Sequence, residues 1–455
     1  MTVKRTKAII ICITIIYAGM SEARSQSATL TLKKCLEYAV ESSHSMTKVR
    51  MESVEASAKT KQTRSSILPQ VDASVSLTDN LAIPVVMLPG EIIGQSGEMI
   101  PAELGVPYEA GLTVQLSQVI FNPALFTGIK AARSVEELML LKTKMTKEQL
   151  IYDVASVYYD ILHSMQELES ISANLNLQDS LYAKTDLRVR EDLAREIDRD
   201  RIRINISDLK VRQARLNTVI EQQKRYLQVL TGMPPNENFS LDNSVLTETG
   251  FPEKRLLYDE NSLSQKTELA VLKHRKQLNR MELKATQMQY LPTLSLVASG
   301  AYQFQSERFQ LNDKTHWFKS AFVGLRLNIP LFDGVSKHHN SKQIKLQGMM
   351  LDNDIDYAEQ SIRMEQKNAM SELIVSHQSA KSQEENLRLA EKVYDRSRML
   401  YQEGLYNVTD LLQTETSLRE AQIAHISELI RFKKAELNWM KAEGTLEKLM
   451  NNSNK

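Results

Sequence analysis

Residues 129–231 contain neither glycine nor proline, and this run constrains the fold more than any other feature of the chain. Because both residue types interrupt helices, their absence predicts one very long helix or a helical hairpin. The charged stretch Arg190–Asp198 favours a hairpin with an elbow there. The first arm, from about Ala124 to Arg190, would be roughly 100 Å long, and few globular domains contain such a rod.

A second elbow of the same kind lies at Tyr401–Leu412. Gly404 is the only glycine between positions 348 and 444, and no proline follows position 330. A lone glycine between two helix-compatible runs marks the end of one helix and the start of the next. When Asp192 is aligned with Gly404, Asp198 falls on Asp410, and both pairs are 212 positions apart (404 − 192 and 410 − 198).

The order of predicted elements occurs twice, so we expect an internal twofold repeat. Each repeat is predicted to hold a helix, two strands and a helical hairpin, which makes the chain mainly α with β. The predicted segments are a first repeat at 26–235 with strands at 71–79 and 108–119 and an elbow near 190–198, a connector at 236–261, a second repeat at 262–450 with strands at 293–305 and 317–330 and an elbow near 401–410, and a tail at 451–455.

The first repeat illustrates the patterns behind these predictions. The run from Leu30 to Ile67 lacks glycine and proline and predicts one helix that ends before Pro69. Strict alternation then gives the strand at 71–79 one apolar and one polar face. Residues 80–107 hold most of the nearby proline and glycine, which predicts a long exposed loop.

Both return arms carry a heptad pattern, which predicts coiled-coil packing against neighbouring helices. The residues of these two seams are Ile202, Ile206, Leu209, Leu216, Ile220 and Leu227 in the first arm, and Leu411, Leu418, His425, Phe432, Trp439 and Leu446 in the second.

The chain begins with a predicted secretory signal at residues 1–25. Lys4, Arg5 and Lys7 precede a short apolar run, and small residues then allow cleavage between positions 18 and 26. An N-terminal anchor helix is the alternative. After the signal, Cys35 is the only cysteine, which excludes an intrachain disulfide. No later run approaches the roughly 18 apolar residues of a membrane helix, so a mature chain that spans a membrane would have to use strands.

The composition and motifs also argue against several function classes. Lys and Arg number 57 against 56 Asp and Glu, a formal net charge of +1, which argues against nucleic acid as a partner. Phosphate-binding glycine loops and Ser or Cys nucleophile motifs are absent, and the eight histidines show no metal-ligand spacing. We therefore expect neither an enzyme nor a bound metal or cofactor.

Short motifs in a fixed order span nearly all of the chain after the signal. They are Leu32-Lys-Lys-Cys-Leu-Glu-Tyr-Ala39, Ile67-Leu-Pro-Gln-Val-Asp72, Tyr290-Leu-Pro-Thr-Leu294, Ile329-Pro-Leu-Phe-Asp-Gly334, and Glu403-Gly-Leu405 followed by Asp410-Leu-Leu412. In these motifs and their spacing the chain resembles the TolC-like outer-membrane efflux proteins, also called outer membrane factors.

The resemblance implies a homotrimer in the bacterial outer membrane that extends into the periplasm. Each chain would give four strands to a closed 12-stranded barrel, a trimeric α/β barrel whose helices form a long periplasmic coiled-coil tunnel. The implied partners are a periplasmic adaptor (membrane fusion) protein, an inner-membrane transporter and outer-membrane lipid. The predicted strands also favour an oligomer. Only a closed barrel satisfies strand backbone groups in lipid, and four strands cannot close a barrel alone.

The resemblance also implies an acidic constriction at the periplasmic end of the tunnel. Family members carry aspartates just beyond the elbows, and the matching positions here are Asp198 and Asp410. In a trimer each would form a ring of three like charges that attracts cations. Where the family often has a second acid, this chain has Gln413, which would make the constriction less cation-selective. The alternative for Asp410 is a helix N-cap after Thr409 or a solvated acid in the first helical turn.

The elbows themselves would dock the adaptor. Aspartate at position 192 departs from the glycine that is usual in the family, but it is among the residues that tolerate a left-handed conformation. The predicted docking residues are Val189, Asp192, Leu193, Gly404, Leu405 and Val408.

Together these features predict a passive exit duct for small molecules such as drugs and toxic compounds. One alternative keeps the fold and makes the protein the outer-membrane component of a type I protein secretion system. Another alternative is a soluble periplasmic coiled-coil scaffold, in which the alternating segments form a β-tip. Membrane fractionation separates the scaffold from the two channels.

Overall fold

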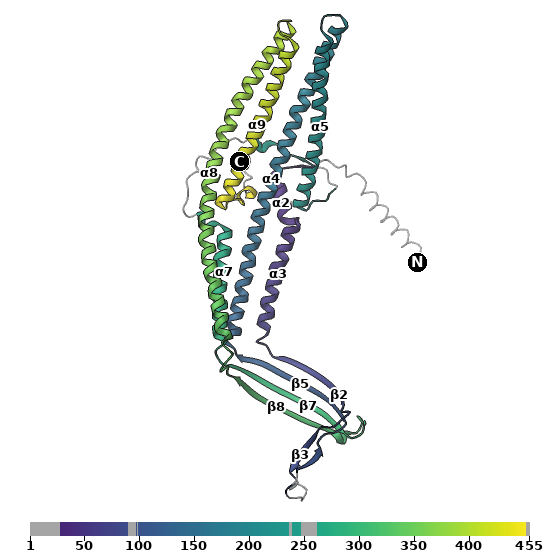
Figure 1. The fold of residues 1–455 in the computed structure, drawn as a ribbon, viewed down its shortest axis with the longest axis vertical. Coiled ribbons are helices and arrows are strands. Elements are labelled where there is room, and N and C mark those ends of the chain that lie inside the picture. The colour runs from purple at the N-terminus through teal and green to yellow at the C-terminus, as the bar shows by residue number, and fades with distance from the viewer. Residues whose placement is uncertain (1–27, 90–96, 98, 236–238, 247–261, 452–455) are drawn as a thin grey trace, which may run out of the picture. The chain divides into compact units, whose positions relative to one another are not determined.

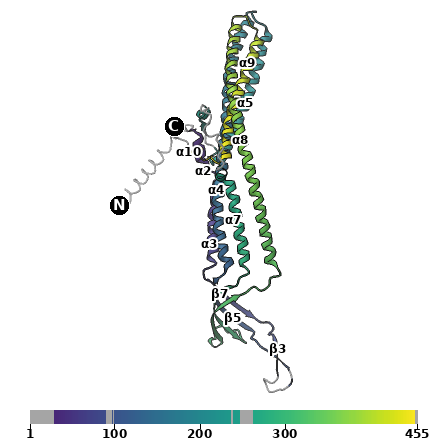
Figure 2. The ribbon, with the colours of Figure 1, turned by 90° about the vertical axis from the view of Figure 1, so that its left-hand side faces the viewer.

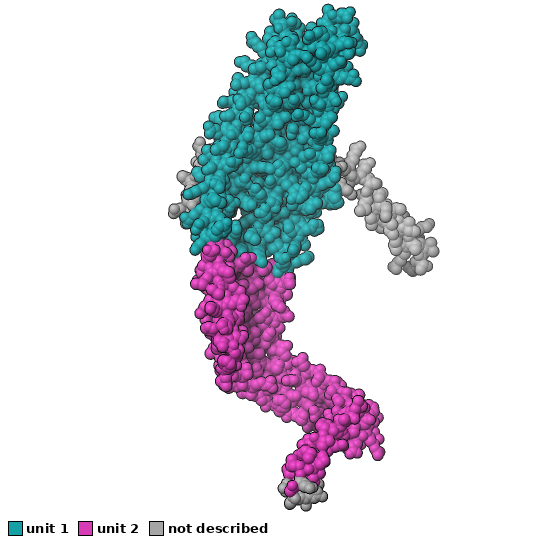
Figure 3. Space-filling view, viewed as in Figure 1, with its two compact units in different colours: residues 1–52, 140–271, 355–455 teal, residues 53–139, 272–354 magenta. Residues whose placement is uncertain are grey.

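The computed structural model describes residues 28–89, 97, 99–235, 239–246 and 262–451. The predicted signal at 1–25, with its cleavage site, lies outside the described residues, and so do residues 452–455 of the tail. The chain divides into two compact units, coloured separately in Figure 3. Unit 1 holds residues 1–52, 140–271 and 355–455, and unit 2 holds residues 53–139 and 272–354.

Unit 2 contains a four-stranded antiparallel sheet, shown in Figure 1. In sheet order its strands are β2 (Gln70–Asp79), β5 (Tyr108–Phe121), β7 (Thr293–Ser306) and β8 (Trp317–Asn328). The outer two, β2 and β8, are therefore its edges. β8 ends at Asn328 rather than at the predicted position 330. Pro330 has no N–H to donate to a sheet, which is consistent with the earlier end.

The strand register gives this sheet one apolar and one polar face, as the alternation predicts. Directly opposed residues share a face. One apolar row across the four strands is formed by Val71, Leu116, Ala298 and Val323. The next row, on the other face, is Asp72, Gln115, Ser299 and Phe322. The apolar face is uncovered in the single chain, where Val323 is 76% exposed.

The segment between β2 and β5 contains a second, small sheet. β3 (Val85–Pro89) pairs in antiparallel fashion with β4 (Met99–Glu103). The prediction of a loop throughout 80–107 is therefore wrong. The prolines and glycines of this segment indicated a loop, although short apolar runs lie between them. Proline is nevertheless compatible with a strand at the edge of a sheet.

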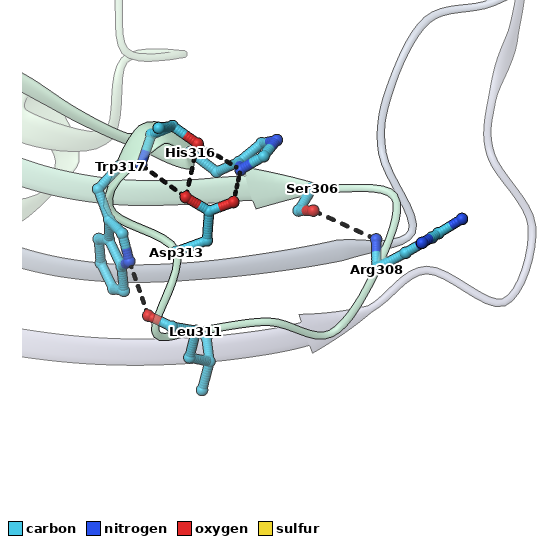
Figure 4. Close-up of polar contacts among 7 residues, drawn as sticks. Ser306, Arg308, Leu311, Asp313, His316 and Trp317 are labelled. Carbon is cyan, nitrogen blue, oxygen red and sulfur yellow. Dashed lines mark hydrogen bonds and ion pairs between the residues drawn. The ribbon is translucent and has the colours of Figure 1, made fainter.

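The loop from β7 to β8 is held by its own side chains, as Figure 4 shows. It includes the short helix η4 (Lys314–His316). Trp317 Nε1 donates a hydrogen bond to Leu311 O (3.0 Å), and the Arg308 N–H donates to Ser306 Oγ (3.2 Å). These bonds tie the two strand ends to the connection between them.

Unit 2 also holds portions of the helices α3 (His44–Ser65), α4 (Pro123–Arg190), α7 (Thr267–Met288) and α8 (Ser336–Gln402). Within the unit, hydrogen bonds join neighbouring helices. They run from Thr60 Oγ1 to Ala132 O (3.1 Å), between Ser134 Oγ and His274 Nε2 (3.0 Å), and from Asn279 Nδ2 to Ile344 O (3.1 Å).

Unit 1 is built around two helical hairpins, which Figures 1 and 2 show from two sides. The first joins α4 to α5 (Glu196–Thr231), and the second joins α8 to α9 (Val408–Glu443). Three shorter helices belong to the same unit: α2 (Leu32–Ser42), α6 (Ser262–Gln265) and α10 (Lys448–Asn451).

The heptad seams form the cores of these hairpins, which confirms the predicted packing. In the first hairpin, Ile171 of α4 packs with Ile202 and Leu209 of α5. In the second, Leu373 of α8 packs with Phe432 of α9. All of these residues are at most 1% exposed, so each seam is a dry helix–helix contact.

Two predictions near the N-terminus need correction. The run Leu30–Ile67 is not one helix, because Ser43 is extended (ψ 146°) and its hydroxyl accepts the Met46 N–H to begin α3. The connector 236–261 is not wholly irregular either. It contains β6 (Phe239–Leu241), which pairs in parallel with β1 (Ala28–Leu30), and the short helix η2 (Ser244–Leu246). Residues 236–238 and 247–261 lie outside the described residues.

No helix in the described part of the chain has the length and apolar character needed to cross a membrane. Groups of three or more His, Cys, Asp or Glu suited to a metal ion are absent among the described residues. Cys35 is buried and free, and burial raises the pKa of its thiol to about 12.

Candidate functional site: the hairpin tips

The two hairpin turns have the same backbone geometry. Asp192 (φ 58°) and Gly404 (φ 77°) both adopt the left-handed conformation, as the elbow alignment predicts. The next N–H in each turn bonds back across the helix end, from Leu193 to Arg188 O (2.7 Å) and from Leu405 to Leu400 O (2.9 Å). This is the Schellman pattern, which satisfies carbonyls that a helix end leaves free.

The helices around the turns also correspond in length. α4 and α8 contain 68 and 67 residues, and α5 and α9 contain 36 each. Both return arms end at a left-handed glycine, Gly232 and Gly444, which lie 212 positions apart (444 − 232). The same offset separates the two turns, and the internal duplication stays a prediction.

The two predicted gate aspartates have different partners. The Asp198 carboxylate receives two hydrogen bonds from the Arg195 guanidinium, at 3.1 and 3.3 Å, and its side chain is 13% exposed. Asp410 instead interacts with Asn407, whose side-chain oxygen accepts the Asp410 N–H (2.8 Å) while its amide donates to the Asp410 carboxylate. Gln413, in the next helical turn, is exposed.

These contacts test the alternative role of Asp410 as a helix N-cap or an acid of the first helical turn. The N-cap of α9 is Asn407, so a cap centred on Thr409 and Asp410 is wrong. Asp410 is the third helical residue, and it pairs with the Asn407 cap through its N–H and its carboxylate. An acid in the first turn is also favoured by the helix dipole.

The predicted docking residues are largely exposed, with one exception. Leu193 and Leu405, at equivalent places in the two turns, are each 72% exposed, whereas Val189 is half-buried. Val408 is only 4% exposed, because it packs into the core with Ile202. The prediction of Val408 as an exposed docking residue is therefore wrong.

Polar contacts join the two hairpins near their tips. Thr185 Oγ1 and Tyr401 OH lie 3.4 Å apart, and the Arg188 guanidinium lies 5.9 Å from the centre of the Tyr401 ring. Arg201 Nη1 donates a hydrogen bond of 2.5 Å to Thr409 Oγ1. These contacts are few and partly solvated, so they hold the tips together with modest strength.

A buried acid close to this end of unit 1 was missed by the sequence reasoning. Glu415 on α9 is 1% exposed, and burial raises the pKa of its carboxyl, against the effects of Arg419 and of Asn205 and Gln178. The sequence does contain a pattern that indicates burial of Glu415. Glu415 lies four residues after Leu411 and three before Leu418, so it belongs to the buried face of the heptad seam.

Comparison with known proteins points to one family. Residues 260–452 match the model of the Outer membrane efflux protein family. Outer membrane protein TolC of Salmonella enteritidis is 21% identical over 362 residues, which cover 74% of this chain and 70% of TolC. The match to the Outer membrane efflux protein family lies in the second half of the chain, at residues 260–452. The chain is an outer-membrane protein of the TolC-like type.

Solved structures show that this chain has the fold of outer-membrane channels. VceC of Vibrio cholerae superposes with a TM-score of 0.70 at 16% identity, covering 91% of this chain and 96% of VceC. The Campylobacter jejuni channel CmeC gives 0.71 at 15% identity, covering 94% and 90%. The mainly helical architecture with a small sheet is therefore shared across nearly the whole length.

Proposed function

We propose that three copies of this chain form the outer-membrane exit duct of a tripartite export system. The duct passively conducts small molecules, such as drugs and other toxic compounds, that an inner-membrane transporter delivers through a periplasmic adaptor. Four strands from each copy make a closed 12-stranded barrel, and the helical hairpins form a periplasmic tunnel.

The observation that carries this proposal is the form of the sheet. Within the described residues, β2 and β8 each pair on one side only, so both edges present unpaired backbone groups. Such edges are costly in lipid, and pairing β8 of one copy with β2 of the next removes them. The apolar face that includes Val71 and Val323 then suits lipid, and the polar face that includes Asp72 and Ser299 suits a water-filled interior.

The tips supply the gate and the docking surface in this proposal. Asp198 and Asp410 form two rings of acids at the constriction, with the uncharged Gln413 behind the second ring. The exposed Leu193 and Leu405, held by the turns at Asp192 and Gly404 and flanked by Val189, receive the adaptor.

Purification in detergent tests the assembly. The expected result is recovery in the outer-membrane fraction, a trimer mass, and a small, mostly closed conductance in planar bilayers. Recovery without detergent would support the scaffold instead and would refute the duct.

Ion selectivity tests the gate. Asp410→Ala should weaken the preference for cations in planar bilayers, and Asp198→Ala should do so less, because Arg195 already neutralises much of that charge. Selectivity that stays at the wild-type value in Asp410→Ala contradicts the gate assignment. A role in type I protein secretion would use the same duct. Cells that carry this protein and export a polypeptide rather than small molecules would favour the secretion role.

A further inference from the structure

Glu415 lies where all four long helices of unit 1 meet. Its carboxyl, on α9, faces uncharged amides from the first hairpin, a tyrosine from α8 and one cation on its own helix. These neighbours are Gln178 of α4, Asn205 of α5, Tyr394 of α8 and Arg419 of α9. With 1% exposure, this acid is shielded from water by both hairpins.

The hydrogen bonds around this carboxyl are incomplete. Asn205 Nδ2 donates to Glu415 Oε2 at 3.2 Å. Arg419 Nη1 lies 3.9 Å from Glu415 Oε1, too far for a hydrogen bond. In the described part of the chain, Glu415 Oε1 and Gln178 Oε1 are both buried without a hydrogen-bond partner.

A proton on Glu415 resolves this arrangement. An ionised carboxylate keeps a buried acceptor oxygen, Oε1, without a partner, whereas a protonated carboxyl is neutral and can itself donate. Buried polar atoms are rarely left unpaired, so the neutral acid fits the packed site better than the carboxylate.

The electrostatics agree with the hydrogen bonds. Burial is the largest effect on Glu415 and raises its pKa, and it outweighs the opposing effects of Arg419 and of the hydrogen bonds from Asn205 and Gln178. Burial also raises the pKa of Tyr394, with the nearby Glu415 charge as the second cause. The position equivalent to Glu415 in the first hairpin is Arg203 (415 − 212), which is exposed, so the buried acid belongs to the second hairpin alone.

We propose that Glu415 is a proton-controlled latch that holds the second hairpin against the first. When it is protonated, α9 stays packed on α4 and α5 and the tips stay together. When it loses the proton, the buried charge weakens this contact and favours separation of the tips. The inference rests on the proposed function, because a latch at the tips acts on a channel.

The direction of the pH effect follows from the shift. In the packed hairpins the pKa of Glu415 is raised, and in separated hairpins it returns towards the ordinary carboxyl range. The packed arrangement is therefore fully stabilised at pH below the ordinary carboxyl pKa. It loses that stabilisation as pH rises through the raised pKa.

Planar-bilayer recordings of the full chain from about pH 4 to about pH 8 test the latch. Wild-type open probability should rise as the pH rises through the raised pKa of Glu415. Glu415→Gln, which is neutral at every pH, should stay closed with a flat profile. Glu420→Gln, an exposed acid on the same helix, should behave as wild type.

Three outcomes would overturn the proposal. They are a wild-type profile that does not change with pH, wild-type pH dependence in Glu415→Gln, and loss of that dependence in Asp410→Asn, which would assign it to the acidic ring. If Glu415→Gln does not assemble, the wild-type and Asp410→Asn profiles still decide the question. Absence of any trimer or conductance from the wild-type protein is a different result, because it refutes the proposed channel itself.

Discussion

Removing the hydroxyl of Tyr401 should make the channel open more often. Tyr401→Phe deletes the contact to Thr185 Oγ1 but keeps the ring over which the Arg188 guanidinium lies. A hydrogen bond typically contributes about 0.5–1.5 kcal/mol, and the 3.4 Å separation places this one at the low end. If the three copies of this contact in a trimer break together, the losses add to about 1.5 kcal/mol, roughly a tenfold gain in the open-to-closed ratio.

Single-channel recording in planar bilayers measures this ratio directly. The matched control is Tyr357→Phe, which removes a hydroxyl from a tyrosine of the same helix that is 71% exposed. Thr185→Val should open the channel similarly, and the double variant should add little, since both changes break one contact. Equal open probability in Tyr401→Phe, Tyr357→Phe and wild type would show that this contact does not hold the tips closed.

Two further predictions concern backbone strain and the membrane face. Gly232→Ala should lower the thermal stability of the trimer far more than Gly404→Ala, because its Cβ would lie 2.4 Å from Ser42 O while that of Gly404 meets nothing within 4 Å. Both changes share the left-handed strain of about 1–2 kcal/mol, so equal melting temperatures would contradict the argument. Val323→Arg on the apolar face should destabilise the membrane-inserted protein by about 2–4 kcal/mol per chain and reduce the amount of assembled trimer on unheated gels. Ser299→Arg on the polar face should leave the amount of trimer unchanged. Similar losses of trimer in the two variants would contradict the assigned orientation of the sheet.

Much of the fold could be predicted because its signals are local. The turns at Asp192 and Gly404 follow from interruptions in long helix-compatible runs, and their left-handed geometry needs no distant partner. The alternating strands likewise carry their own period. The β3 and β4 pairing was missed because proline and glycine around short apolar runs indicate a loop as readily as a hairpin.

The site was less predictable because burial depends on what packs against each helix. Val408 lies three residues before Leu411, so the heptad seam extends to it, but its place at a helix start suggested exposure. The burial of Glu415 likewise follows from its place on the heptad seam. Its charge suggested a solvated position, although the seam places it inside, and only the packed helices show which oxygens are left without partners.

The two tips share one backbone geometry but differ in their side-chain contacts. Equivalent turns place Asp198 and Asp410 at equivalent positions, but Arg195 precedes one helix and Asn407 precedes the other. A guanidinium neutralises the carboxylate that it binds, whereas an amide leaves its charge in place. In the proposed channel, the acidic character of the constriction would therefore rest mainly on Asp410. Because Glu415 is carried by that same second hairpin, the charge at the mouth and the proposed proton latch would move together when the hairpin moves.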